Sequence, residues 1–290
     1  MRVALIQQKS YPTKQQTIDK TLYMITKAKE QDANLVILQE LHQDRYFCIN
    51  ESIKNFDLAN DFENDLKFWS KVAKDNKIVL VTSLFEKRVA GVYHNSAFVF
   101  DSDGSLAGKY RKMHIPHDQG FYEKFYFTPG DLGFCPIDTS VGRLGVLICW
   151  DQWFGEAARI MALKGAEILI YPTAIGWFDS DSEDEKKRQL DAWITIQRSH
   201  AISNSLPLVS VNRVGFEKDD KNLIDGIRFW GNSFIVGNQG EFLKQASNDK
   251  EEIILHDIDL KRCEKIRQVW PFFRDRRVDF YDELNKKFLS

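Results

Sequence analysis

The sequence predicts an α/β fold formed by a single domain, and three features of the chain indicate it. Short runs of Val, Ile and Leu alternate with stretches that place an apolar residue every three or four positions. No internal repeat, long linker or break in composition divides the chain. Its 290 residues are enough to bury a substantial core. We therefore expect helices on the faces of mixed sheets, in one domain over residues 1–290.

The first half of the chain is predicted to contain two amphipathic helices among short strands. A helix is expected over 17–30, because its apolar side chains fall on one face, and a second over 62–74. The apolar runs predict strands at 3–7, 35–38, 78–81, 95–100 and 106–110. The turn at 101–104 has a hairpin-type sequence, so the last two of these strands should pair.

The second half continues the alternation. Apolar runs predict strands at 143–148, 168–171, 208–211, 233–236 and 253–258. Helices are expected at 155–165 and 186–204. From about residue 261 the chain becomes a charged and aromatic tail.

Composition and charge exclude several classes of function. The net charge of −2 argues against a nucleic-acid binder that depends on a basic field. No stretch approaches the ~20 apolar residues of a membrane span. The apolar run at the start meets Gln7 and Gln8 too early for a signal peptide. These features predict a protein without nucleic-acid or membrane partners.

The cysteines and acids indicate no metal site. Four widely scattered cysteines form neither a disulfide framework nor a zinc-ligand spacing, which predicts a reducing, cytoplasmic location. The acidic run 179–185 resembles the start of a calcium loop. It has Asp184 and Leu190 where an EF-hand requires Gly and Glu. We therefore expect a solvated loop and a helix start there.

Cys149 is the first candidate for a nucleophile. It ends the apolar run 143–148 and precedes a helix-like segment, so its thiol should lie on a sharp turn at a sheet edge, where ligands tend to bind. The N-terminus of that helix would favour the thiolate. The alternative is a structural core cysteine, because a free Cys behaves as a small apolar residue. The local pattern alone leaves these two interpretations about even.

A thiol that attacks an amide carbon needs a base and a group that stabilises the oxyanion. Glu40 follows an apolar strand, where a carboxylate beside the core is suited to move a proton near neutral pH. Lys112 lies in an alternating basic stretch, so Lys112 and Arg111 should point to opposite faces of a strand, one toward a site and one toward solvent. The alternative for both Glu40 and Lys112 is a charged side chain that is exposed to solvent and has no role in a site.

Three ordered motifs together give a specific match. The segments 35–40, 110–116 and 147–151 resemble, in order and spacing, the signature of the nitrilase (carbon–nitrogen hydrolase) superfamily. The resemblance covers roughly residues 2–280. It implies a four-layer α-β-β-α sandwich of the nitrilase type.

The resemblance also implies roles for single residues. In that superfamily a Glu, a Lys and a Cys form a catalytic triad, and the motif positions are Glu40, Lys112 and Cys149. Glu123 matches a second glutamate of the amidases in this superfamily; the alternative is a loop carboxylate paired with a nearby cation. The backbone N–H of Trp150 would assist Lys112 at the oxyanion. Neither a metal nor an organic cofactor is implied.

Subunit assembly is a further implication. Members of the superfamily dimerise through their sandwiches, often with higher assembly, so we expect a homodimer or a larger homo-oligomer. The tail from about residue 261 is expected at a subunit interface. Trp270, Phe272 and Phe273 would otherwise form an exposed apolar patch.

The substrate follows from finer similarity. The segments 123–127, 148–154 and 165–176 look closely like those of N-carbamoylputrescine amidases. Carbamoyl-D-amino-acid hydrolases have arginines where this chain has Gln152 and Trp153, so a substrate carboxylate lacks a bidentate partner. The resemblance implies hydrolysis of N-carbamoylputrescine to putrescine, ammonia and carbon dioxide, a step in polyamine synthesis from agmatine.

An amine-ended substrate suits a pocket with aromatic walls and an acid at the far end. The expected walls are Trp150, Trp153 and Tyr122, and the expected acid is Asp118 or a member of the 179–185 run. Three alternatives remain at this point. They are another linear amidase or ureidase such as a β-ureidopropionase-like enzyme, a catalytically silent relative, and a redox-sensing thiol.

Overall fold

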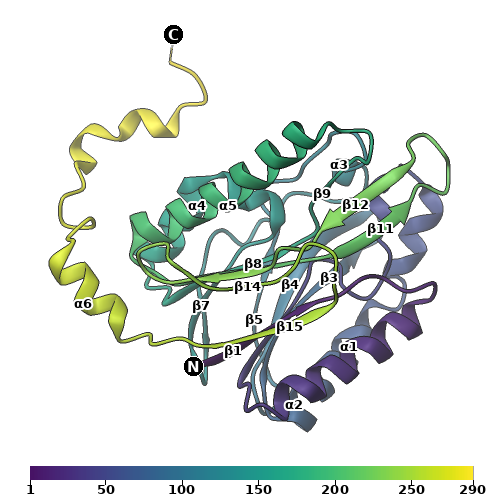
Figure 1. The fold of residues 1–290 in the computed structure, drawn as a ribbon, viewed down its shortest axis with the longest axis horizontal. Helices are drawn as coiled ribbons and strands as arrows, with labels where there is room; N and C mark the ends of the chain where they lie inside the picture. Colours follow the sequence, from purple (N-terminus) through teal and green to yellow (C-terminus); the bar gives the residue numbers. More distant parts are fainter. Residues whose placement is uncertain (290) are drawn as a thin grey trace.

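Two six-stranded sheets form the centre of the molecule, a computed structural model that describes residues 1–289 (Figure 1). The first sheet has the strand order β15 (Glu252–Asp257), β1 (Arg2–Gln7), β2 (Leu35–Leu38), β3 (Val79–Val89), β4 (Val92–Phe100), β5 (Leu106–Arg111). The second has the order β14 (Phe242–Gln245), β13 (Phe234–Val236), β10 (Leu208–Asn212), β8 (Ile168–Thr173), β7 (Gly142–Val146), β6 (Ile137–Thr139).

Two pairs of helices cover the outer faces of the sheets. Helices α1 (Lys14–Lys29) and α2 (Phe62–Asn76) lie together on one side of the molecule, and α4 (Gly155–Leu163) and α5 (Glu183–Asn204) lie on the opposite side (Figure 1). The predicted four-layer α-β-β-α sandwich is therefore confirmed. The shorter helices are α3 (Glu123–Tyr126), α6 (Arg262–Val269) and the 3-10 turns Phe47–Ile49, Ile53–Ala59, Cys149–Trp153, Val278–Phe280 and Asp282–Asn285.

Alternation along the strands separates two apolar layers. In β1, Val3 and Leu5 belong to the core between the sheets, whereas Ala4 and Ile6 belong to the core under α1 and α2. Successive side chains of a strand point to opposite faces, so a strand that is apolar at every position must be covered on both faces. This requirement produces the four layers.

Local sequence sets the helix starts. The Thr13 hydroxyl accepts a hydrogen bond from the backbone N–H of Gln16, whose side chain accepts the N–H of Thr13, and this capping box begins α1. Ser182 caps α5, and three acids occupy its first turn. The prediction of a helix start in the 179–185 run is thus confirmed.

Strand direction brings the ends of distant segments together. Strands β1, β2 and β3 are parallel, and β5 has the same direction because two antiparallel pairings separate it from β3. The carboxyl ends of β2 and β5 therefore lie at one edge of the first sheet. Glu40 follows β2, and Lys112 follows β5. Cys149 follows β7 in the facing sheet.

The sequence-based element bounds were wrong in two places. Strands β3 and β4 form a hairpin much longer than expected, and several strands were missed, including β6 at the edge of the second sheet. Three others, β9 (Gly176–Trp177), β11 (Val214–Lys218) and β12 (Gly226–Trp230), form a small sheet of their own. The strand β11 alternates between buried and exposed residues without the continuous apolar run that marks the central strands.

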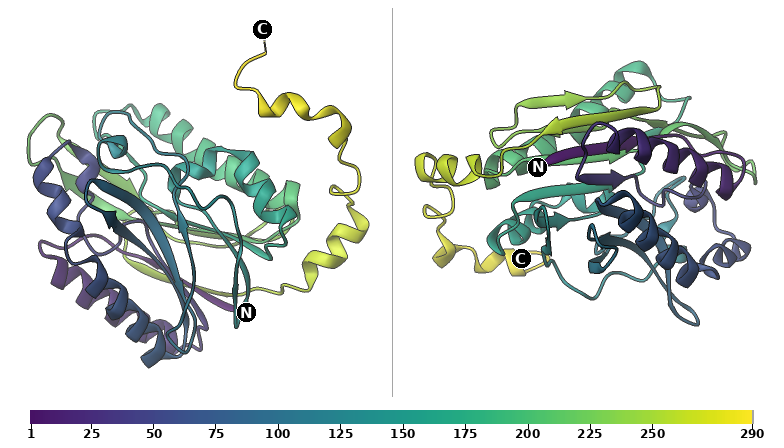
Figure 2. Two further views of the ribbon diagram at one scale, coloured as in Figure 1. Left: turned by 180° about the vertical axis from the view of Figure 1, so that it is seen from behind. Right: turned by 90° about the horizontal axis from the view of Figure 1, so that it is seen from below.

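The C-terminal arm, residues 270–289, extends away from the sandwich (Figures 1 and 2). It carries apolar side chains that are largely exposed, including Trp270, Phe280 and Phe288. Phe273 differs from the sequence-based expectation, because it packs against the guanidinium groups of Arg159 and Arg267 in the same chain. Among residues 1–289, no helix combines the length and apolar character needed to cross a membrane.

Candidate active site

Cys149 occupies a strained turn, as the sequence predicted. Its φ angle is +41°, in the left-handed region that side-chain-bearing residues seldom adopt. The carboxylate of Asp151 holds the turn, since its Oδ2 accepts the backbone N–H of Ile148 at 2.9 Å and the Tyr110 hydroxyl at 2.8 Å. The other oxygen accepts the backbone N–H of His114 at 3.0 Å. These contacts fix the position of the thiol.

The helix after Cys149 was expected to favour the thiolate, but the surroundings of the thiol oppose its ionisation. The thiol is buried, and burial raises its pKa well above the ordinary value; Glu40 and Glu123 add to the effect, and Lys112 opposes it. The segment directly after Cys149 is a 3-10 turn, and α4 begins only at Gly155, so the thiol is not at the first turn of that helix. A reaction of this thiol would require a base to remove its proton.

Glu40 is buried beside this thiol, and hydrogen bonds to one of its two carboxylate oxygens hold it in place. Its Oε1 accepts hydrogen bonds from Asn95 Nδ2 and from Lys112 Nζ, each at 2.7 Å. Its Oε2 is buried and has no hydrogen-bond partner among the described residues. A carboxylate oxygen without a partner is an available proton acceptor.

Lys112 lies between two carboxylates. Its ammonium donates to Glu40 Oε1 and to Glu123 Oε2, both at 2.7 Å, and all three side chains are buried. Burial alone would lower the pKa of Lys112, but the charges of Glu123, Glu40 and Cys149 outweigh it and raise the pKa well above its usual range. An ammonium has three donors, so one remains for a further acceptor.

The neighbouring Arg111 corrects a second expectation. It points away from Lys112, as predicted, yet it does not face solvent. Its guanidinium is buried and pairs with Glu86 at 2.6 Å and with Asp131 at 2.8 Å. Both faces of the end of β5 therefore carry buried ion pairs.

Glu123, the first residue of α3, is also part of the cluster. Besides Lys112, it contacts the Tyr46 hydroxyl, which donates to its Oε1 at 2.8 Å. Burial raises the pKa of Glu123 to about 7, with Lys112 opposing the shift and Glu40 adding to it. The alternative of a loop carboxylate paired with a cation describes the contact with Lys112, but this pair is buried at the centre of the site.

Tyr46 and Asn95 were missed by sequence reasoning. Tyr46 stands before a short 3-10 turn whose pattern resembles no helix or strand. Asn95 lies within β4 and its amide is buried. A polar residue among apolar strand residues usually has a buried hydrogen-bond partner, and this was the one signal in the sequence that could have identified Asn95. Each directs one hydrogen bond to a carboxylate of the cluster.

A cavity of about 490 Å³ opens onto this cluster. Cys149 and Glu123 lie in its wall, and the indoles of Trp150 and Trp153 line it, as expected. Tyr122 was wrongly expected in this wall. Its ring instead lies 5.6 Å from that of His117, outside the lining residues.

The charged side chains of the cavity wall are all acidic. The lining residues in the described chain include Asp118, Asp181 and Glu123, and no Lys or Arg. Burial raises the pKa of Asp118. Within the 179–185 run, Asp179 pairs with Arg228 at 2.6 Å, whereas Asp181 lines the cavity. Of the acids expected to bind an amine, Asp118 and Asp181 therefore line the cavity.

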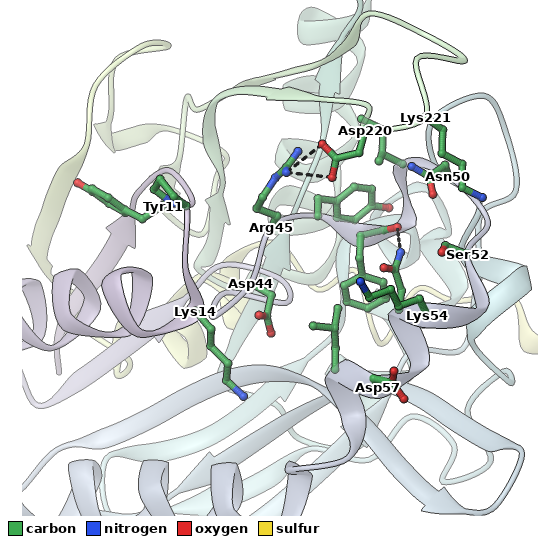
Figure 3. Close-up of a pocket in the computed structure, with 16 residues that line it drawn as sticks. Tyr11, Lys14, Asp44, Arg45, Asn50, Ser52, Lys54, Asp57, Asp220 and Lys221 are labelled. Carbon is green, nitrogen blue, oxygen red and sulfur yellow. Dashed lines mark hydrogen bonds and ion pairs between the residues drawn. The ribbon is translucent and has the colours of Figure 1, made fainter.

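A second cavity, of about 620 Å³, is separate from this site (Figure 3). Its labelled side chains carry both signs of charge, and Arg45 and Asp220 form an ion pair in its wall. The Tyr46 ring belongs to this wall, so this residue separates the second cavity from Glu123. Within residues 1–289, no three His, Cys, Asp or Glu side chains are grouped so as to hold a metal ion.

Replacing Glu123 with Gln should flatten the pH dependence of stability. The folded-state pKa of about 7 exceeds the ordinary 4.5, so the folded chain binds this proton more tightly than the unfolded chain. The resulting stabilisation is complete below the unfolded-state pKa and is lost as pH rises through about 7. Urea unfolding at several pH values across this window should show a steeper loss in the parent protein than in the variant. Equal slopes would contradict a raised pKa.

Comparison with known proteins shows similarity along the whole chain. The family model "Carbon-nitrogen hydrolase" matches residues 2–268. A protein of Oryza sativa subsp. japonica named N-carbamoylputrescine amidase is 39% identical, over 97% of this chain and 93% of its own. A Francisella tularensis subsp. tularensis protein named citrullinase is 38% identical, over 99% of each chain.

Solved structures show the same fold. A carbon–nitrogen hydrolase of Helicobacter pylori G27 superposes with a TM-score of 0.98 at 56% identity, covering 100% of this chain and 99% of the other. An amidase of Nesterenkonia sp. superposes with a TM-score of 0.80 at 23% identity, covering 98% and 96%. The fold, the ordered motifs and these relatives agree, and the chain belongs to the carbon–nitrogen hydrolase family.

Proposed function

We propose that the protein hydrolyses N-carbamoylputrescine to putrescine, ammonia and carbon dioxide through a cysteine-linked intermediate. One observation carries the proposal: a buried Cys–Glu–Lys–Glu cluster opens into a cavity whose charged lining residues are all acidic. A relative at 39% identity is named N-carbamoylputrescine amidase, which supports this choice of substrate.

The first step is the attack of Cys149 on the ureido carbon. Because the pKa of the thiol is raised, a base must remove its proton as the carbon–sulfur bond forms. Glu40 takes this role, since its Oε2 is buried without a partner. The proton then passes from Glu40 to the departing nitrogen, and the carbon–nitrogen bond breaks.

The negative charge that develops on the carbonyl oxygen needs fixed donors. Lys112 supplies the N–H that neither carboxylate occupies, and the backbone N–H of Trp150, next to the nucleophile, supplies a second. Loss of one such donor typically costs about 3–4 kcal/mol of barrier. Glu123 holds Lys112 in place and contributes a carboxyl group to the cavity wall.

Water completes the cycle. Glu40 removes a proton from a water molecule, which attacks the S-carbamoyl carbon and releases the thiol. The resulting carbamic acid decomposes to carbon dioxide and the second amine product. One water is consumed for each ureido group.

The cavity wall favours an amine-ended substrate. In the proposed complex a butylammonium chain lies against the cavity wall that Trp150 and Trp153 form, with its charge near Asp118 and Asp181. Citrulline and N-carbamoyl-β-alanine contain the same ureido group; citrulline ends in an α-ammonium and a carboxylate, and N-carbamoyl-β-alanine ends in a carboxylate alone. That carboxylate would meet acidic side chains and no guanidinium fork. The relative named citrullinase makes citrulline the second candidate, at 38% identity.

We also propose that two copies of the chain associate and that the C-terminal arm packs on the partner. The arm leaves the sandwich and exposes Trp270, Phe280 and Phe288. Contiguous apolar surface of this kind marks interaction sites in soluble proteins.

Replacing Cys149 with Ala or Glu40 with Gln should abolish ammonia release from N-carbamoylputrescine, with a loss of at least about 10³-fold in kcat, because each removes a group that takes part in bond exchange. The control is Cys135→Ala, since this second free thiol is exposed and lies outside the cavity wall. Substantial turnover by the Cys149 variant would refute the mechanism.

Replacing Asp118 and Asp181 with Asn should raise KM for N-carbamoylputrescine about tenfold for each acid, the equivalent of about 1.4 kcal/mol, with a smaller change in kcat. Steady-state kinetics with L-citrulline as a second substrate test the assignment. The matched control is Asp184→Asn, in the first turn of α5 and outside the cavity wall. If the parent protein prefers citrulline, the proposed substrate is wrong; if the Asn variants keep the parental KM, the amine-end assignment is wrong.

Removal of residues 270–289 should lower the mass of the assembly, because the arm would no longer bridge subunits. Size-exclusion chromatography with light scattering measures this mass for the full and shortened chains. A monomeric full-length chain, or an unchanged mass after truncation, would contradict the proposed role of the arm.

A further inference from the structure

A closed ring of hydrogen bonds links both carboxylates of the site to a buried ion pair that the mechanism above does not use. This pair is Arg213 and Glu217, at 2.8 Å. We propose that Arg213 and Glu217 are positioning residues that hold Glu40 and Glu123 at a fixed separation on either side of Lys112. This inference rests on the proposed function, because it assigns these residues to the same reaction.

One half of the ring holds Glu40 through its backbone. Arg213 is fully buried between β10 and β11, and its Nη2 donates to the carbonyl oxygens of Glu40 at 3.1 Å and Leu41 at 2.9 Å. Its Nη1 donates to the carbonyl of Asp44 at 2.8 Å and to Glu217. One guanidinium thus donates hydrogen bonds to three backbone carbonyls of the segment that follows β2.

The backbone of this segment needs stabilising contacts of this kind. Leu41 has a φ of +47°, a strained value for a residue with a branched side chain. The backbone N–H of Glu40 has only a long contact, 3.4 Å, with the carbonyl of Thr173. Strained turns persist where the surroundings over-determine them. Here Arg213 supplies the strongest polar contacts to the turn.

The other half of the ring reaches Glu123. Glu217 Oε2 accepts the backbone N–H of Tyr46 at 2.7 Å. The hydroxyl of Tyr46 donates to Glu123 Oε1, and Glu123 Oε2 accepts from Lys112, which returns to Glu40. Every link joins buried groups, so a shift of the ion pair changes the placement of both carboxylates.

Stability alone is a weak explanation for a buried ion pair, because apolar replacements of similar volume often serve as well. The placement of the reacting groups is a stronger explanation for the buried ion pair. Misplacing a reacting group by about 1 Å can cost about 10²-fold in rate. Arg213 is not among the residues that line the substrate cavity, so we expect its effect to pass through Glu40 and, by way of Glu217, through Tyr46.

The test compares Arg213→Met, Arg213→Lys and Glu217→Gln with the parent protein. Two rates are measured: kcat for ammonia release from N-carbamoylputrescine, and the rate at which iodoacetamide alkylates Cys149, followed by mass spectrometry. We expect Arg213→Met to lower both about 100-fold with KM changed less than about threefold. Arg213→Lys should recover part of each rate, because an ammonium can still bind two of the carbonyls.

The control for general destabilisation is Ile25→Ala, a buried truncation in α1, in the core on the far side of the first sheet. It should lower Tm and leave both rates near those of the parent. Equal rate losses in the control, or a folded Arg213→Met variant with near-parental rates, would overturn the inference.

Two further outcomes remain decisive. If Arg213→Met does not fold, Glu217→Gln keeps the volume and removes the charge; a loss of about tenfold in both rates supports the inference, and parental rates reject it. If the parent releases no ammonia from N-carbamoylputrescine, the proposed substrate fails. The alkylation rates of the variants then still decide whether the ion pair positions the base.

Discussion

The buried ammonium of Lys112 is the interaction on which the rest of the site depends. Two carboxylates could not lie this deep in the sandwich without a cation between them, because burying an unpaired charge is very costly. With Lys112 present, Glu40 and Glu123 each contribute one oxygen to it at 2.7 Å. The remaining oxygen of Glu123 accepts from Tyr46, whereas that of Glu40 has no hydrogen-bond partner among the described residues, so two chemically equal groups acquire different surroundings.

Those surroundings give the carboxylates different properties. Glu123 accepts from Tyr46 and has a pKa near 7, raised by burial. Glu40 keeps one oxygen without a partner, beside a thiol whose pKa is raised. Division of labour between a pair of titratable groups follows from such environments rather than from residue type. The fold supplies them by placing the ends of β2 and β5 at one sheet edge.

The sequence was sufficient for the layers and for the central residues of the site. Continuous apolar runs such as 35–38 are typical of buried strands, and Glu40 and Cys149 follow two such runs; the family resemblance supplied the four layers and the expected roles of these two residues. Tyr46 and Arg213 could not be found in this way. They act through contacts with segments up to 173 residues distant, and no local periodicity reports such a contact. The ionisation of Cys149 was misjudged for a related reason, since burial by remote segments outweighs the local turn.

The resting state of Cys149 also bears on how the protein withstands oxidants. Peroxide reacts with thiolates, and a buried neutral thiol presents little of that form. The free thiol that is open to solvent is Cys135, which lies outside the cavity wall. Oxidative damage should therefore fall first on a cysteine that the reaction does not need. In the proposed mechanism the Cys149 thiol loses its proton only as it attacks the substrate, so it would be shielded from peroxide between turnovers without a partner thiol.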